Sequence, residues 1–175
     1  MKKILVLLLL IAPMSMFAQK FGYINSKDII QLMPEFSKAQ KEIQDLEKMY
    51  TDDFNALRTE LEKKGTEFEK LQKDSVPENI LKRRYEELMQ LEERLRQYSQ
   101  DITANLQKAE AEKMMAIQKS LLDVLDAVGR EGSYICIFDL AGGMPYVSTT
   151  LCDDLSAKVK ARLGIPANAV PAVSK

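Results

Sequence analysis

The sequence predicts an α+β protein that is mostly α-helical, with a long antiparallel helical hairpin (a coiled-coil arm) on a small β-rich oligomerisation body. Between Tyr23 and Val128 the only glycine is Gly65, and the only prolines are Pro34 and Pro77. This stretch is rich in Glu, Lys, Leu and Gln, which favour helix. The strand-like segments lie at its two ends, so we expect them to form the body together.

The composition excludes several classes of function. The 175 residues contain 25 basic and 26 acidic side chains, two cysteines and no histidine. Without histidine, histidine-based catalytic triads and histidine metal ligands are impossible. The chain has neither a P-loop nor a dinucleotide-binding motif, and its balanced charge argues against nucleic acid as the main partner. We expect a binding or structural protein rather than an enzyme, with no catalytic residue, metal or cofactor.

An enzyme would have to use adjacent carboxylates as acid and base, such as Asp153 with Asp154 or Glu92 with Glu93. Neighbouring residues on a helix point apart, so neither pair favours this reading.

Residues 1–18 resemble a secretory signal peptide. Lys2 and Lys3 precede an unbroken apolar run from Ile4 to Ile11, and Ala18 offers a small residue at the expected cleavage site. The apolar run is short for a transmembrane helix, although a retained interfacial anchor stays an alternative. We expect the cleaved chain to be exported and soluble.

The expected hairpin has a helix from Pro34 to Lys73 and a second from Val76 to Val128. The tip lies near residues 74–77. There Ser75 and Glu78 match a capping box, and Pro77 suits the first turn of a helix. Forty helical residues extend for about 60 Å.

A narrow apolar seam predicts that the two helices pack along their length. Apolar residues recur every seven positions at Phe36, Ile43, Tyr50 and Leu57, and at Leu81, Leu88, Leu95 and Ile102. Polar residues interrupt the seam at Asp53, Glu60, Arg84 and Asn105. We therefore expect an arm that bends and frays. Gly65 is either a hinge or a tolerated residue.

The body is expected to combine residues 19–33 and 129–164, with the arm at 34–128 and a disordered tail at 165–175. Strands are predicted at 20–25, 133–139 and 146–150, the last two forming a hairpin. Asn25 or Ser26 would cap a short helix at 27–32. A final helix would begin at Asp153 or Asp154 and run to Leu163.

A body of this size is marginal by itself, and the strand at 133–139 carries apolar residues on both faces. We expect a homo-oligomer in which strands of several chains share one core. The candidates for that core are Phe21, Tyr23, Ile135, Ile137, Phe138, Tyr146 and Val147. Cys136 and Cys152 are expected to be unpaired, packed thiols, with a disulfide as the alternative.

The segment FGYINSKDIIQLMPEFSKAQ at 21–40 resembles the Skp/OmpH family of periplasmic chaperones, as do the strand after the hairpin and Asp153-Asp154-Leu155 before the last helix. The resemblance covers roughly residues 21–163. It implies a periplasmic homotrimer whose arms surround a cavity and hold unfolded outer-membrane proteins without ATP. The well-known members have basic arm tips, whereas this tip is close to neutral, so contact with anionic membranes stays open.

Such a chaperone needs adaptable apolar surface, which methionine supplies. The candidate client-binding residues are Met49, Met89, Met114, Met115 and Ile117. Packing against the seam or a neighbouring chain is the alternative, above all for the last three. An envelope scaffold without clients is the alternative function.

Overall fold

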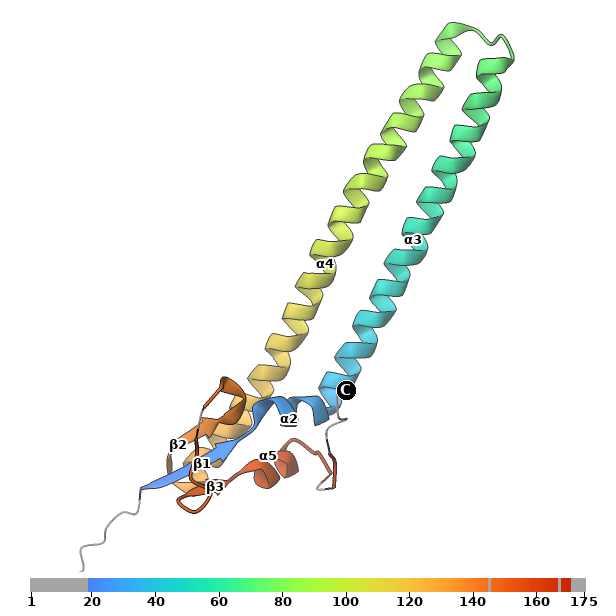
Figure 1. The fold of residues 1–175 in the computed structure, drawn as a ribbon. Coiled ribbons are helices and arrows are strands. Elements are labelled where there is room, and N and C mark those ends of the chain that lie inside the picture. Colours follow the sequence, from blue (N-terminus) through green and yellow to red (C-terminus); the bar gives the residue numbers. More distant parts are fainter. Residues whose placement is uncertain (1–18, 145, 167, 171–175) are drawn as a thin grey trace, which may run out of the picture.

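The computed structural model describes residues 19–144, 146–166 and 168–170, and the signal-peptide prediction lies outside them. A long two-helix arm projects from a small mixed body, in which the strands and short helices gather at one end (Figure 1). The predicted α+β, mostly α-helical fold class is confirmed.

The arm consists of α3, Pro34–Lys73, and α4, Glu78–Gly132. The bounds of α3 agree with the prediction. Helix α4 begins two residues later than expected and continues to Gly132, so it runs from the arm into the body (Figure 1). The predicted capping box at Ser75 is wrong, because the N-cap of α4 is Pro77 and makes no side-chain hydrogen bond. Ser75 instead adopts a left-handed conformation, with φ of 47°, in the turn that reverses the chain.

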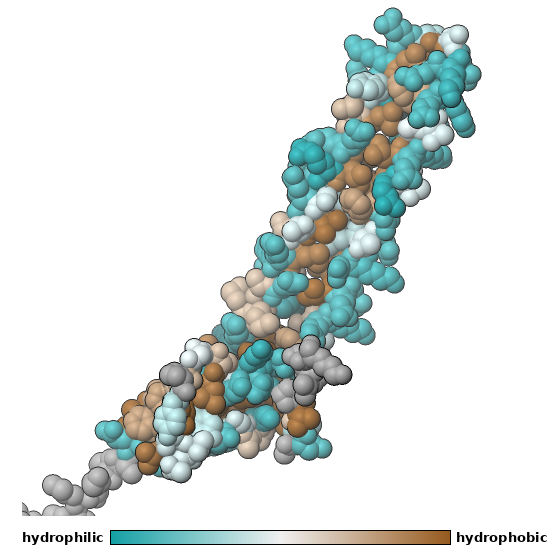
Figure 2. Space-filling view, in the orientation of Figure 1, coloured by the Kyte–Doolittle hydropathy of each residue, from teal (hydrophilic) through white to brown (hydrophobic). Residues whose placement is uncertain are grey.

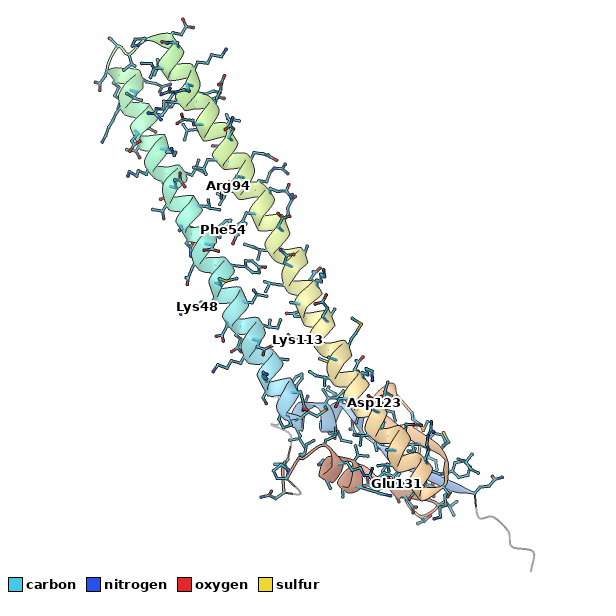
Figure 3. The ribbon with its side chains drawn as sticks, turned by 180° about the vertical axis from the view of Figure 1, so that it is seen from behind. Lys48, Phe54, Arg94, Lys113, Asp123 and Glu131 are labelled. Carbon is cyan, nitrogen blue, oxygen red and sulfur yellow. The ribbon has the colours of Figure 1, made fainter. Side chains whose placement is uncertain are left out.

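The apolar seam of the arm contains few buried side chains. None of the described α3 residues is buried, and Leu91 is the buried residue in the distal part of α4. Apolar side chains follow the middle of the arm, with hydrophilic side chains on its flanks (Figure 2). In Figure 3, Phe54 lies between the two helices, whereas Lys48 points away from them. The arm is therefore a thin pair of rods whose apolar stripe stays partly open to solvent.

The body contains a parallel three-stranded sheet in the order β2-β1-β3. The strands are β1, Lys20–Ile24; β2, Tyr134–Asp139; and β3, Cys152–Asp154. The predicted hairpin with a strand at 146–150 is wrong. After β2 the chain forms the short 3-10 helix η1, Leu140–Gly142, and reaches the far side of β1 before the next strand begins.

Two short helices complete the body. Helix α2, Ser26–Leu32, has Asn25, one of the two predicted candidates, as its N-cap, because the Asn25 side chain accepts a hydrogen bond from the Asp28 N–H. Helix α5, Ser156–Arg162, begins later than expected, since Asp153 and Asp154 belong to β3.

The core joins β1, α2, α4 and α5. Its buried side chains are Ile24, Ile29, Met33, Ile117, Leu121, Val128, Leu155, Val159 and Ile165. Residues 117–128 of α4 therefore serve both the arm and the body. Ile165 is buried and Ala169 packs against the core, so disorder from residue 165 onward was a wrong expectation; residues 171–175 lie outside the described part.

Two glycines make a matched stability test. A Cβ on Gly22 would lie 2.4 Å from Cδ1 of the buried Leu155, whereas nothing lies within 4 Å of a Cβ on Gly65. We expect Gly22→Ala to destabilise the body by about 1–3 kcal/mol, because Leu155 must move. Gly65→Ala should stabilise α3 by up to about 1 kcal/mol through helix propensity.

Thermal unfolding and hydrogen exchange of both variants measure these effects. A Gly22→Ala protein as stable as the parent would contradict the packing described for β1.

Candidate binding surfaces of the arm and the body

A furrow follows one side of the distal half of the arm. It consists of three hollows of about 390, 260 and 350 Å³. The first two share Glu60 and Arg94, and the second and third share Lys64 and Glu87. Because neighbouring hollows share these lining residues, the three lie end to end along the arm, and we call this row of hollows the distal furrow. Three of the polar residues that interrupt the seam, Asp53, Glu60 and Arg84, line it.

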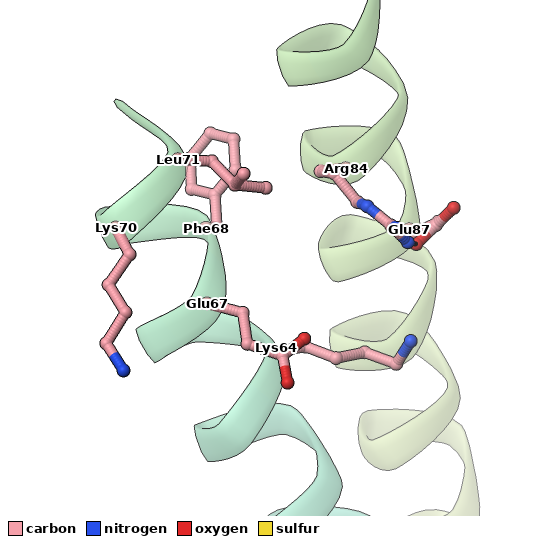
Figure 4. A pocket seen from close by; sticks show the side chains of 7 residues that line it. All are labelled: Lys64, Glu67, Phe68, Lys70, Leu71, Arg84 and Glu87. Atoms are coloured by element: carbon pink, nitrogen blue, oxygen red, sulfur yellow. Dashed lines mark hydrogen bonds and ion pairs between the residues drawn. The ribbon is translucent and has the colours of Figure 1, made fainter. Parts of the chain in front are cut away.

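The distal furrow has an apolar floor and charged walls. Leu57, Leu91, Phe68 and Leu71 supply apolar surface from both helices. Near the tip, Lys64 and Glu67 extend from α3 toward α4, while Arg84 and Glu87 lie on α4 (Figure 4). The polar residues that interrupt the seam therefore line hollows between the helices, and both helices continue past them.

Some wall charges are already paired. Arg84 donates to Glu87 at 2.7 Å, and this hydrogen bond lowers the pKa of Glu87. Tyr98 Oη donates to Asp53 Oδ2 at 3.1 Å across the two helices. Within the described residues, Glu60, Lys64, Glu67, Lys70 and Arg94 make no ion pair. None of these five charges is held in an ion pair within that part of the chain, although the Lys64 charge also lowers the pKa of Glu87.

A second, more apolar groove lies at the base of the arm. Its volume is about 330 Å³, and Phe36, Ala39, Ile43, Met114 and Ile117 supply its apolar surface. Lys113, on its rim, forms an ion pair with Glu42 of the facing helix, and the hydrogen bond from Lys113 lowers the pKa of Glu42. This pair links α3 to α4 directly above the core.

The five proposed client-binding residues have different environments. Met49 and Met89 are 49% and 46% exposed along the arm, and Met115 is exposed near the base. Met114 is half-buried and lines the base groove. Ile117 is only 4% exposed and belongs to the core, in agreement with the packing alternative and not with a client-binding position. At this level the apolar stripe of α4 faces α2 and α5, so Ile117 is buried against the body.

The residues predicted for the oligomer core also differ in exposure. Ile135 and Tyr146 are 61% and 78% exposed. Phe21 and Phe138 stack with ring centroids 6.0 Å apart and, like Tyr23 and Val147, are half-buried. Ile137 packs against the chain's own core instead.

Sequence reasoning missed two exposed leucines on the body side. Leu122 follows Met115 by one heptad on α4, and this spacing was the signal for it. Leu151 lies in the turn before β3, where no periodicity marks it.

The two cysteines lie on opposite edges of the sheet. Both pair with Phe21 in the strand register, Cys136 from β2 and Cys152 from β3. Two strand spacings, about 9.6 Å, separate them, which is too far for a disulfide within the chain. Both are free, as expected, but Cys136 is exposed rather than packed.

The carboxylate of Asp139 connects the end of β2 to the start of α2 through hydrogen bonds. Asp139 Oδ1 accepts hydrogen bonds from the Ser26 and Ala141 N–H groups, each at 3.0 Å. Burial alone would raise the pKa of Asp139, but these hydrogen bonds outweigh it and hold the pKa below its ordinary value. The ionised form therefore fixes the corner at which the chain leaves the sheet.

In the part of the chain that the structure describes, no three His, Cys, Asp or Glu side chains are grouped to hold a metal ion. Within the same residues, none of the helices combines the length and apolar character needed to cross a bilayer.

The fold and its surfaces define a class of protein in which a small body carries a long, partly apolar arm suited to contact with another macromolecule. The family model described as "Outer membrane protein (OmpH-like)" matches residues 20–163, and the chain belongs to this family. At the family level, its members are periplasmic chaperones of outer-membrane proteins. A search of curated proteins found no match.

The hydrogen bonds that Asp139 accepts predict that the stability of the fold depends on pH. Because folding lowers this pKa, ionised Asp139 stabilises the fold above about pH 4, and its contribution disappears as the pH falls through the folded pKa. Asp139→Ala should lower the melting temperature at neutral pH by about 3 °C, since two hydrogen bonds are lost.

Asp139→Asn, which keeps an acceptor oxygen, should retain more of this stability and lose the acid-dependent part. Melting curves from pH 3 to 7 make the comparison; identical pH profiles for all three proteins would refute this role of the Asp139 carboxylate.

Proposed function

We propose that this chain is an ATP-independent holdase of the periplasm, which binds unfolded outer-membrane proteins between its arms and prevents their aggregation. Export would depend on the signal peptide at residues 1–18, cleaved before Gln19. The observation that carries the proposal is the arm: a long hairpin in which α3 buries none of its described residues and both helices keep apolar side chains open to solvent.

The arm suits weak contact with many different segments. Met49, Met89 and Met115 are exposed, and methionine adapts its shape to irregular apolar partners. Ion pairs along its helices mostly join residues three or four apart and lie on the exposed surface. They leave the apolar stripe uncovered, so a client can reach it without breaking them.

The body supports assembly of several copies into a homotrimer, the number that family resemblance implies. Strand β2 lies at the edge of the sheet, and its residue Ile135 is exposed. An open apolar edge strand invites pairing with another chain. Sister copies would cover this edge and the half-buried pair Phe21 and Phe138, and their arms would then surround a shared space.

A client-free envelope scaffold is the competing function, since a spacer would also use a long hairpin on an oligomeric body. The two differ in what they do to an unfolded chain: a scaffold leaves it to aggregate.

One experiment tests the holdase function and the assembly together. A urea-unfolded porin-type β-barrel protein is diluted into buffer with the signal-free chain, and turbidity is recorded without ATP. We expect aggregation to be suppressed at about one assembled trimer per client, and light scattering to give three times the mass of one chain. Full aggregation beside an intact oligomer would favour the scaffold, and a folded monomer would overturn the assembly.

Exposed methionines should contribute to client affinity. Met49→Gln combined with Met89→Gln removes apolar contact area from the middle of the arm, and we expect client binding to weaken about fivefold, on the order of 1 kcal/mol. Fluorescence anisotropy with a labelled unfolded client measures the change.

Lys48→Gln is the control, because it alters an exposed side chain at the level of Met49 and leaves the apolar area intact. Unchanged affinity in the double variant would remove these methionines from the binding surface.

A further inference from the structure

We propose that the distal furrow binds a single extended polypeptide segment in which apolar and polar side chains alternate. The inference rests on the proposed holdase function and adds, beside the exposed methionines, one part of the arm that holds a segment of the client, and the conformation of that segment. It is carried by the end-to-end arrangement of the hollows, the cross-section and the charge balance of the furrow.

The furrow is long and narrow. On α3 its lining runs from Asp53 to Leu71, and on α4 from Arg84 to Tyr98. At a rise of about 1.5 Å per residue these segments extend for roughly 27 and 21 Å. An extended chain advances about 3.3 Å per residue, so the furrow accommodates about six to eight residues in one line. A compact ligand would fill one hollow, whereas an extended chain can contact all three.

The cross-section suits a strand with two different faces. Side chains of an extended segment point alternately to opposite sides. One set would meet the apolar floor at Leu57, Leu91, Phe68 and Leu71, while the other set faces solvent. Transmembrane strands of outer-membrane barrels have this alternation over about ten residues. A continuous apolar segment would leave half of its side chains against water or the charged walls.

The wall charges favour a polypeptide over a strongly charged ligand. Four acidic residues, Asp53, Glu60, Glu67 and Glu87, are balanced by four basic ones, Lys64, Lys70, Arg84 and Arg94. An anionic or cationic polymer would meet like charges along the whole furrow. A peptide backbone instead offers N–H donors to carboxylates and C=O acceptors to lysine and arginine. The charges without an ion pair, Glu60, Lys64, Glu67, Lys70 and Arg94, can make these bonds without breaking others.

A bulky side chain at Ala56 would block the furrow. Ala56 is exposed and lines its first hollow, so Ala56→Trp fills space without changing charge or removing packing from the core. Ala104→Trp is the matched control, since Ala104 is exposed on α4 and lies outside the hollows of the furrow. Circular dichroism and light scattering on both variants verify that fold and assembly are intact.

The probe is a fluorescent peptide about ten residues long, with valine or tyrosine alternating with threonine or glutamine. A second peptide has the same composition with its apolar residues grouped together. Anisotropy titrations should show the alternating peptide binding at least about fivefold more tightly to the parent protein. Ala56→Trp should weaken that binding about tenfold, and Ala104→Trp should leave it within about twofold.

Equal affinity for the two peptides, or equal binding by the two tryptophan variants, would overturn the inference. The turbidity assay with a full-length unfolded barrel protein separates this failure from failure of the proposed function. If the parent protein suppresses aggregation while Ala56→Trp leaves peptide binding unchanged, the client is held elsewhere on the arm. If the parent suppresses no aggregation, the holdase function itself is wrong.

Discussion

The pairing of β1 with β2 is the constraint on which the rest of the structure depends. Phe21 lies opposite Cys136, so the first strand of the described chain is joined to a strand more than a hundred residues away. Parallel neighbours need a crossover connection, and here the crossover contains the whole arm. Both ends of the hairpin are thus tied to one sheet: α3 through α2 and β1, and α4 directly through β2. The arm can be long and weakly packed because both of its helices are anchored to the same sheet at the base.

The sequence predicted the arm better than the body, and the reason is the range of the interactions. Pro34 begins α3 and Asn25 caps α2 because those preferences act within one helical turn. The β3 strand, Cys152–Asp154, contains two aspartates and has no strand-like pattern; only its pairing with β1 makes it a strand. The parallel order of the sheet likewise depends on contacts that no local window contains.

The candidate binding surfaces were likewise predictable only where local sequence patterns decide exposure. The exposure of Met49 and Met89 followed from their positions off the heptad seam. For Ile117 the same criterion left packing as an alternative, and Ile117 is buried because at the base α4 packs against the body as well as against α3. Asp53, Glu60 and Arg84 were recognised as interruptions of the seam, but only the paired helices bring them together as the walls of one furrow.

The place of β3 in the sheet has a consequence for the order in which the molecule acquires its shape. A hairpin of neighbouring helices can form as soon as its second half has been synthesised, since its contacts spread outward from the turn at residues 74–77. The sheet has to wait for residues 152–154, which follow the hairpin in the sequence, before β1 gains its second neighbour. During that interval the arm of a nascent chain has folded but its body has not. The unpaired strands of the body can then associate wrongly with other chains, as those of any unfolded polypeptide can.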